Sequence, residues 1–134
     1  MKIAYTLWTW LMDEYNEWKP PSGNPKGDFE KSLREVSDLQ YPAFENFNLL
    51  AKVYEDYPEE FEKLVKQYNL EFVCLYHYFT ADFAADMEMG EKCCKFLVRH
   101  HAKYMNIQAP WAPALGTTAK ELDEMVDKLA KMGN

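Results

Sequence analysis

Side chains suited to binding follow each of the four segments that the sequence predicts as strands. They are Trp8, Trp10, Glu45, His77, Gln108 and Trp111. Aromatic faces stack on the C–H patches of sugars, while carboxylate, imidazole and amide groups bond the sugar hydroxyls. If the fold brings these strand ends together, the set predicts a binding site for a carbohydrate.

Each of these residues also has an ordinary structural interpretation. His77 could bond the backbone at the end of its strand, and Glu45 could be a solvated carboxylate or the partner of a lysine. Trp8 and Trp10 could pack in the core as readily as they could form a sugar platform. The choice between these interpretations depends on the elements that position the residues.

Hydrophobic periodicity predicts four strand–helix units in one domain that covers residues 1–134. The predicted strands are residues 2–8, 42–45, 70–76 and 104–108, and the expected helices begin near Asp28, Pro58, Met87 and Thr118. Alternating strands and helices with crossovers of this length indicate an α/β fold with a parallel sheet. Ligands of such folds gather at the carboxyl ends of the strands.

The helices carry predicted caps and core faces. Asp28 is the expected N-cap of the first helix, because a short acceptor side chain suits that position. In the third helix, about residues 87–101, we expect Cys94, Leu97 and Val98 to be buried. The apolar stripe of the last helix is Leu122, Met125, Val126 and Leu129.

The cysteines and the paired histidines predict no further site. Cys74, Cys93 and Cys94 are odd in number and two are adjacent, which suits reduced thiols in a cytoplasmic protein. His100 and His101 fall late in the third helix, where solvation or complementation of the helix dipole is expected.

Composition excludes several classes of partner. The 134 residues include 15 Lys and Arg against 22 Asp and Glu, a formal charge of −7, and the basic residues form no cluster. Neither nucleic acid nor an anionic membrane surface is therefore an expected partner. The apolar segment 3–12 is too short to span a bilayer. The glycine-rich loops of dinucleotide and P-loop nucleotide sites are missing from the sequence.

Three passages resemble one enzyme family. They are residues 1–8 (MKIAYTLW), 36–45 (VSDLQYPAFE) and 72–77 (FVCLYH). They look like the sugar phosphate isomerase/epimerase family, the xylose isomerase-like TIM barrels that include inosose dehydratases and endonuclease-IV-like proteins. Members are eight-stranded barrels of roughly 250 residues or more. The resemblance therefore implies a parallel (β/α)4 unit, the N-terminal half of a TIM barrel.

The resemblance implies an activity and a cofactor for the complete family. Its members transfer a proton between sugar carbons with a divalent metal (Mn, Co, Mg or Zn), held mainly by Glu, Asp and His after the later strands. By resemblance, Glu45 and His77 occupy positions that face a sugar or sugar phosphate. Because the later strands have no counterpart in this sequence, we expect the chain alone to bind no metal and to have weak or no activity.

Two alternatives stay open at this stage. A half-barrel leaves two strand edges and an apolar sheet face uncovered, which predicts a homodimer or a complementing half-barrel. The chain would then be a non-catalytic carbohydrate-binding or self-assembling module. The other alternative is a self-contained flavodoxin-like α/β domain, which would need a closed core and a fifth strand.

Overall fold

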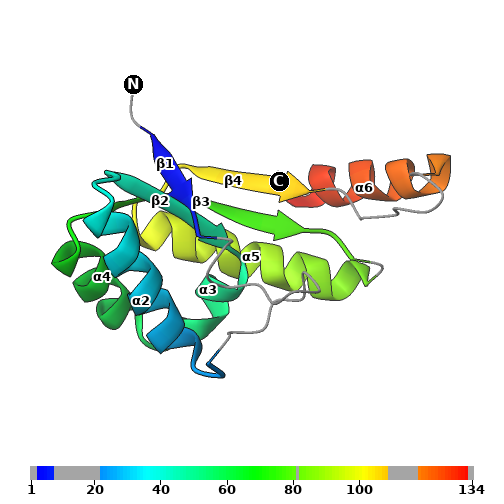
Figure 1. The fold of residues 1–134 in the computed structure, drawn as a ribbon. Coiled ribbons are helices and arrows are strands. Elements are labelled where there is room, and N and C mark those ends of the chain that lie inside the picture. Colours follow the sequence, from blue (N-terminus) through cyan, green and yellow to red (C-terminus); the bar gives the residue numbers. More distant parts are fainter. Residues whose placement is uncertain (1–2, 8–21, 81, 109–117, 133–134) are drawn as a thin grey trace.

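The protein is a four-stranded parallel sheet whose strands alternate with helices (Figure 1), as the sequence predicts. The computed structural model describes residues 3–7, 22–80, 82–108 and 118–132. The elements are β1 (Ala4–Thr6), α2 (Pro25–Asp38), β2 (Ala43–Phe47), α3 (Leu49–Val53), α4 (Pro58–Gln67), β3 (Glu71–Tyr78), α5 (Phe83–Arg99), β4 (Tyr104–Gln108) and α6 (Ala119–Met132). The strand order is β1-β2-β3-β4, so consecutive strands are neighbours throughout.

The first helix, α2, begins earlier than the sequence predicts. Its N-cap is Asn24, whose Oδ1 accepts a hydrogen bond from the Gly27 backbone at 3.1 Å. The predicted cap, Asp28, lies inside the first turn and accepts a hydrogen bond from the Ser22 backbone at 3.1 Å. The prediction was wrong because Pro25 was assigned to the preceding turn, although proline is well suited to the first helical position.

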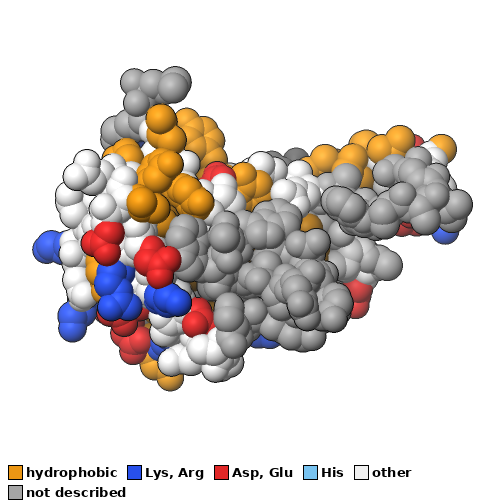
Figure 2. Space-filling model, in the orientation of Figure 1, with side chains coloured by type: hydrophobic (Ala, Val, Ile, Leu, Met, Phe, Trp, Pro, Cys, Tyr) orange, Lys and Arg blue, Asp and Glu red, His pale blue; other side chains and the backbone are white. Residues whose placement is uncertain are grey.

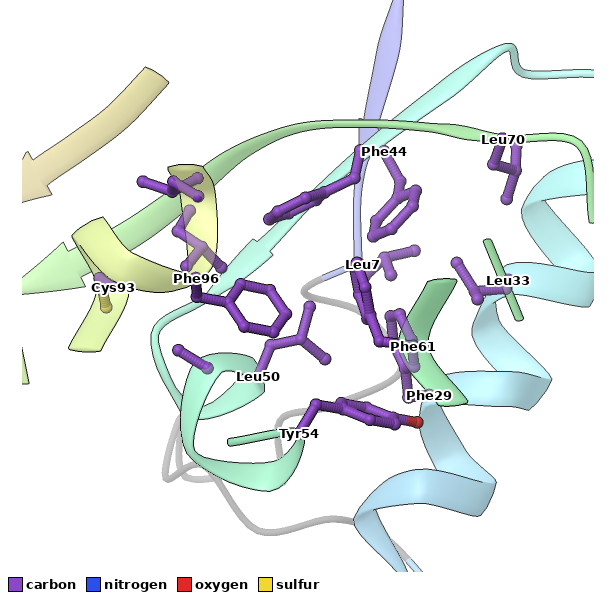
Figure 3. Close-up of a cluster of buried hydrophobic side chains, with 14 of the residues drawn as sticks. Leu7, Phe29, Leu33, Phe44, Leu50, Tyr54, Phe61, Leu70, Cys93 and Phe96 are labelled. Carbon is purple, nitrogen blue, oxygen red and sulfur yellow. The ribbon is translucent and has the colours of Figure 1, made fainter. Parts of the chain in front are cut away.

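One face of the sheet packs against the helices. In Figure 1, helices α2 to α5 lie on the same side of the strands. Figure 3 shows Phe61 of α4 among other buried aromatic side chains, including Phe29, Phe44 and Phe96. The ring centroid of Phe61 lies 5.3 Å from that of Phe72 of β3 and 4.9 Å from that of Phe96 of α5. Phe29 of α2 stacks on the same ring at 5.8 Å. Burial of these large rings is the main source of stability on this face.

A bulge in β3 decides which of its side chains face the helices. Phe44 of β2 pairs with Phe72, but the next residue, Glu45, pairs with Cys74, so Val73 is the extra residue. Side chains alternate along a strand, and an extra residue reverses the alternation beyond it. Leu75 and His77 are therefore buried on the helix side, at 0% and 1% exposure, and Tyr76 lies on the opposite face.

The buried face of α5 differs from the predicted one. Cys93, Phe96 and Leu97 are buried, whereas Cys94 is exposed and Val98 is 76% exposed. The prediction of a buried Cys94 and Val98 was wrong because it placed the core stripe one residue away from the actual one. Positions 93, 96, 97 and 100 follow the helical repeat, and this stripe faces Phe61.

His100 completes this stripe, in contrast to the expectation of a solvated residue. Its side chain is 2% exposed, and its ring centroid lies 4.5 Å from Phe61 and 4.4 Å from Phe96. Burial is the main reason that the pKa of His100 is lowered, and Glu62 opposes this effect from 3.3 Å. His100 therefore packs as a neutral aromatic ring.

The last helix, α6, contacts α5 through a lysine rather than through its apolar stripe. Lys128 is 4% exposed, whereas Leu122, Val126 and Leu129 are 46%, 59% and 40% exposed. Figure 2 shows hydrophobic side chains along the outer side of α6, on the right of the view. Within the described residues, no helix combines the length and the apolar composition needed to cross a bilayer.

Candidate functional site

The sheet face opposite the helices holds a hydrogen-bonded group that we name the Glu45 cluster, consisting of Thr6, Glu45 and Tyr76. The three residues come from β1, β2 and β3. Oε1 of Glu45 accepts hydrogen bonds from the Thr6 hydroxyl and from the Tyr76 hydroxyl, the latter at 2.8 Å. All three side chains are half-buried, so the cluster is reachable from solvent.

The two hydroxyl groups have fixed roles in this cluster. Burial, together with the hydrogen bond to Glu45 and its negative charge, raises the pKa of the Tyr76 phenol. The phenol therefore stays protonated at neutral pH and donates to the carboxylate. Both donors end on Oε1, so Oε2 of Glu45 receives no hydrogen bond from these two hydroxyls and can accept one from a ligand.

Aromatic and amide side chains extend the face beyond the Glu45 cluster. The ring of Phe47 lies 5.5 Å from that of Tyr76. Tyr78 at the end of β3 is 44% exposed and pairs in register with Gln108 of β4. Tyr104, at the start of β4, is 67% exposed. A carboxylate, hydroxyls and exposed rings on one surface suit a small polyhydroxylated molecule.

His77 belongs to a different group, at the carboxyl end of β3 on the helix side. Its Nδ1 is 3.1 Å from the Asn48 side-chain nitrogen, and its Nε2 is 3.0 Å from the Asp86 carbonyl oxygen. The Asn48 side-chain nitrogen can only donate and the Asp86 carbonyl oxygen can only accept, so Nδ1 of His77 is the acceptor and Nε2 carries the proton. Burial is the main reason that the pKa of His77 is lowered, so the ring is neutral.

The Asp86 carboxylate at the start of α5 completes this second group. It accepts hydrogen bonds from the Thr80 backbone at 2.9 Å and from the Thr80 hydroxyl at 2.9 Å, and it forms an ion pair with Lys128 of α6. Burial alone would raise the pKa of Asp86, but Lys128 and Thr80 outweigh it and hold that pKa below its usual value. We name His77, Thr80, Asp86 and Lys128 the Asp86 cluster.

The structure brings only part of the predicted site together. Glu45 and Gln108 lie on the same sheet face, two strands apart. His77 lies on the other face, with both ring nitrogens engaged by the protein. The remaining predicted contacts, Trp8, Trp10 and Trp111, lie outside the described residues.

Sequence reasoning missed the partners of Glu45. Thr6 was inside the first predicted strand and Tyr76 was inside the third, so neither was considered as a site residue. The sequence could have indicated them only by their positions within adjacent parallel strands, because polar side chains of such strands can meet on one face of the sheet. The bulge at Val73, which turns Tyr76 rather than His77 toward Glu45, has no signature in the sequence.

The divalent metal that the resemblance implies does not fit the described side chains. Among the residues in the four described ranges, no three His, Cys, Asp or Glu side chains form a group that could hold a metal ion. In the Glu45 cluster the two neighbours of the carboxylate are hydroxyl donors, and a divalent ion needs several anionic or neutral oxygen or nitrogen ligands. A metal-assisted step therefore has no support in this part of the chain.

Comparison of the sequence with protein-family models and with curated proteins gives no match in either case. What the protein does is therefore inferred from the geometry of the two clusters and from the resemblance of the strand segments.

Proposed function

We propose that the chain is one half of a sugar isomerase/epimerase-like barrel and that the face around the Glu45 cluster binds a sugar or a related small polyol. The supporting observation is that two hydroxyls both bond Oε1 of a half-buried carboxylate on the sheet face opposite the helices and so fix its orientation, which leaves Oε2 to accept a hydrogen bond from a ligand. Ligand hydroxyls would donate to Oε2 of Glu45, and the ring of Tyr78 would pack on the C–H patches of the sugar.

The resemblance supports the barrel assignment and the four-stranded parallel sheet is compatible with it. In such a barrel the face opposite the helices becomes the interior, which places Glu45 inside. We expect ketose isomerisation by the chain alone to be weak or absent, since the described residues offer no metal ligand set. Turnover at ordinary enzyme rates with added Mn²⁺ or Mg²⁺ would contradict this expectation.

Calorimetric titration with D-xylose, D-fructose and myo-inositol tests the binding proposal. We expect at least one of them to bind with a Kd on the order of millimolar. Glu45→Gln should weaken this binding about tenfold, because it removes a charge-assisted acceptor. Glu91→Gln is the matched control, since it removes one carboxylate from the exposed side of α5. Absence of binding by all three sugars, or equal weakening by the two variants, would contradict the proposal.

Self-assembly is a second candidate, and the exposed apolar side chains on the edge strands favour it. Ile3, next to β1, is 53% exposed, and Tyr104 of β4 is 67% exposed. β1 and β4 are the two edges of the sheet. If β4 of one copy paired in parallel with β1 of a second copy, two sheets would close into an eight-stranded barrel without free edges.

We also propose a cytoplasmic location for the protein. All three cysteines, Cys74, Cys93 and Cys94, are free, and two of them are buried. Reduced thiols of this kind are typical of a reducing compartment.

A further inference from the structure

The described strands carry only acidic charges, whereas the helices carry both acidic and basic residues. Among the residues of β1 to β4 there is no Lys or Arg, and the acidic residues are Glu45 and Glu71. On the face that carries the Glu45 cluster, the described strands therefore present a carboxylate and uncharged side chains to a ligand. Within the described strands no cation is available to neutralise an anionic ligand.

Three cations on the helix side, Lys92, Arg99 and Lys128, are already engaged. Lys92 and Arg99 of α5 bond Glu55 and Glu59 at 3.1 and 2.9 Å. Lys128 is held between the Asp86 carboxylate and the Thr80 carbonyl, the latter at 2.8 Å. Recruiting any of them to the opposite face would break these contacts and require crossing the sheet.

The hydrogen-bonding direction on the face points to the same ligand chemistry. Thr6 and Tyr76 both spend their hydroxyl hydrogens on Oε1 of Glu45, so the cluster offers acceptors to a ligand and keeps no donor for it. A sugar hydroxyl can donate to these acceptors. A phosphate that has lost its protons presents only acceptor oxygens and negative charge.

We propose that the ligand of the Glu45 cluster is an uncharged polyol and that the cluster selects against the phosphorylated form of the same sugar. This inference rests on the proposed function, because it names the chemical class of ligand for that site. The Glu45 carboxylate thus has two roles. It accepts hydrogen bonds from sugar hydroxyls, and its partly desolvated negative charge repels a phosphorylated sugar.

Paired titrations with D-fructose and D-fructose 6-phosphate in the same buffer test the selectivity. We expect D-fructose to bind and D-fructose 6-phosphate to bind about tenfold more weakly or worse, the effect of one to two like charges at contact distance in high dielectric. Glu45→Gln should reduce the ratio of the two dissociation constants (D-fructose 6-phosphate over D-fructose) to about threefold or less, because it removes the charge that repels the phosphate. Glu91→Gln changes the net charge of the protein equally and should leave the ratio unchanged.

The possible results separate the selectivity from the proposed function. If D-fructose 6-phosphate binds as tightly as D-fructose, or if Glu45→Gln weakens D-fructose without narrowing the ratio, the selectivity assignment is overturned and polyol binding stands. If Glu91→Gln narrows the ratio as much as Glu45→Gln does, the discrimination comes from net charge and the assignment is again overturned. If neither sugar binds, both the proposed function and the selectivity fall.

Discussion

The protein contains two polar clusters of similar composition that differ in how completely the protein satisfies them. In the Asp86 cluster, Asp86 is 2% exposed. Its carboxylate accepts hydrogen bonds from Thr80 and forms an ion pair with Lys128. In the Glu45 cluster, the carboxylate is half-buried and both of its donors meet on one oxygen. The protein itself supplies the partners of the Asp86 carboxylate, whereas Oε2 of Glu45 can still accept a hydrogen bond from a ligand.

This difference separates a structural role from a binding role. A buried carboxylate must be fully paired, because an uncompensated charge inside the protein is costly. A half-buried carboxylate can keep an unused oxygen because solvent satisfies it until a ligand arrives. Composition alone does not distinguish the two, since each cluster contains one carboxylate and at least one hydroxyl.

The largest expected effect comes from opening the closed cluster. Lys128→Met should lower the free energy of unfolding by about 3–5 kcal/mol, because it leaves Asp86 buried without its cation. Urea denaturation followed by circular dichroism measures the change. Lys120→Met is the control, since Lys120 pairs with Glu124 on the surface of the same helix and should cost less than about 1 kcal/mol. Equal losses in the two variants would show that the Asp86 cluster is not structurally special.

The next largest effect should come from acid, which should destabilise the packing on the helix side of the sheet. Burial holds the pKa of His77 and of His100 below the ordinary 6.5, so both rings take up protons on unfolding. Stability is therefore complete above about pH 6.5 and falls as the pH drops below it, by at most about 1.4 kcal/mol per pH unit for each ring. Urea denaturation from pH 7.5 to pH 5 measures this slope.

The histidine variants identify the groups responsible for the acid effect. His100→Phe should reduce the slope to the part due to His77, because phenylalanine fills the space between Phe61 and Phe96 without titrating. The exposed neighbour His101 has a positive φ of 59°, so His101→Asn is a compatible control that should leave the slope as it is. A slope that is unchanged in His100→Phe and reduced in His101→Asn would contradict the assignment.

Much of the fold could be predicted from the sequence, because it depends on patterns that local physics controls. The strand Tyr104–Gln108 has the predicted bounds, and the apolar run from Phe72 to Leu75 indicated a buried parallel strand. The parts that could not be predicted depend on tertiary contacts. The bulge at Val73 exchanges the faces of Tyr76 and His77, and the burial of Lys128 depends on Asp86, 42 residues earlier. The sequence therefore indicated Glu45, but not Thr6 and Tyr76, as a member of the candidate site.

Replacement of Glu45 should have a small effect on stability. Glu45→Gln keeps the size of the side chain and its Oε1 acceptor, and the site is half-buried, so the free energy of unfolding should change by less than about 1 kcal/mol. The same urea denaturation measures it. A loss as large as that of Lys128→Met would show that Glu45, too, is a structural residue.

Substitution of an exposed residue on the edge strand β4 should change self-association but hardly change the stability of the monomer. If the strand edges pair between two copies, light scattering should give a dimer for the natural sequence and a monomer for Tyr104→Lys, since Tyr104 is 67% exposed on the edge strand β4. The stability of the monomer should change by no more than about 0.5 kcal/mol. Val98→Lys, at a residue of α5 that is 76% exposed, is the control. A natural sequence that stays monomeric at high concentration would contradict the paired-edge arrangement.

The most direct test of the account is a chemical-shift map of sugar binding on the isotope-labelled protein. On addition of D-fructose, we expect the largest changes at Thr6, Glu45 and Tyr76, and no comparable changes at His77 or Asp86. In Glu45→Gln the same changes should require about tenfold more sugar. Changes centred on the Asp86 cluster, or no changes anywhere, would contradict the assignment of the binding site to the sheet face opposite the helices.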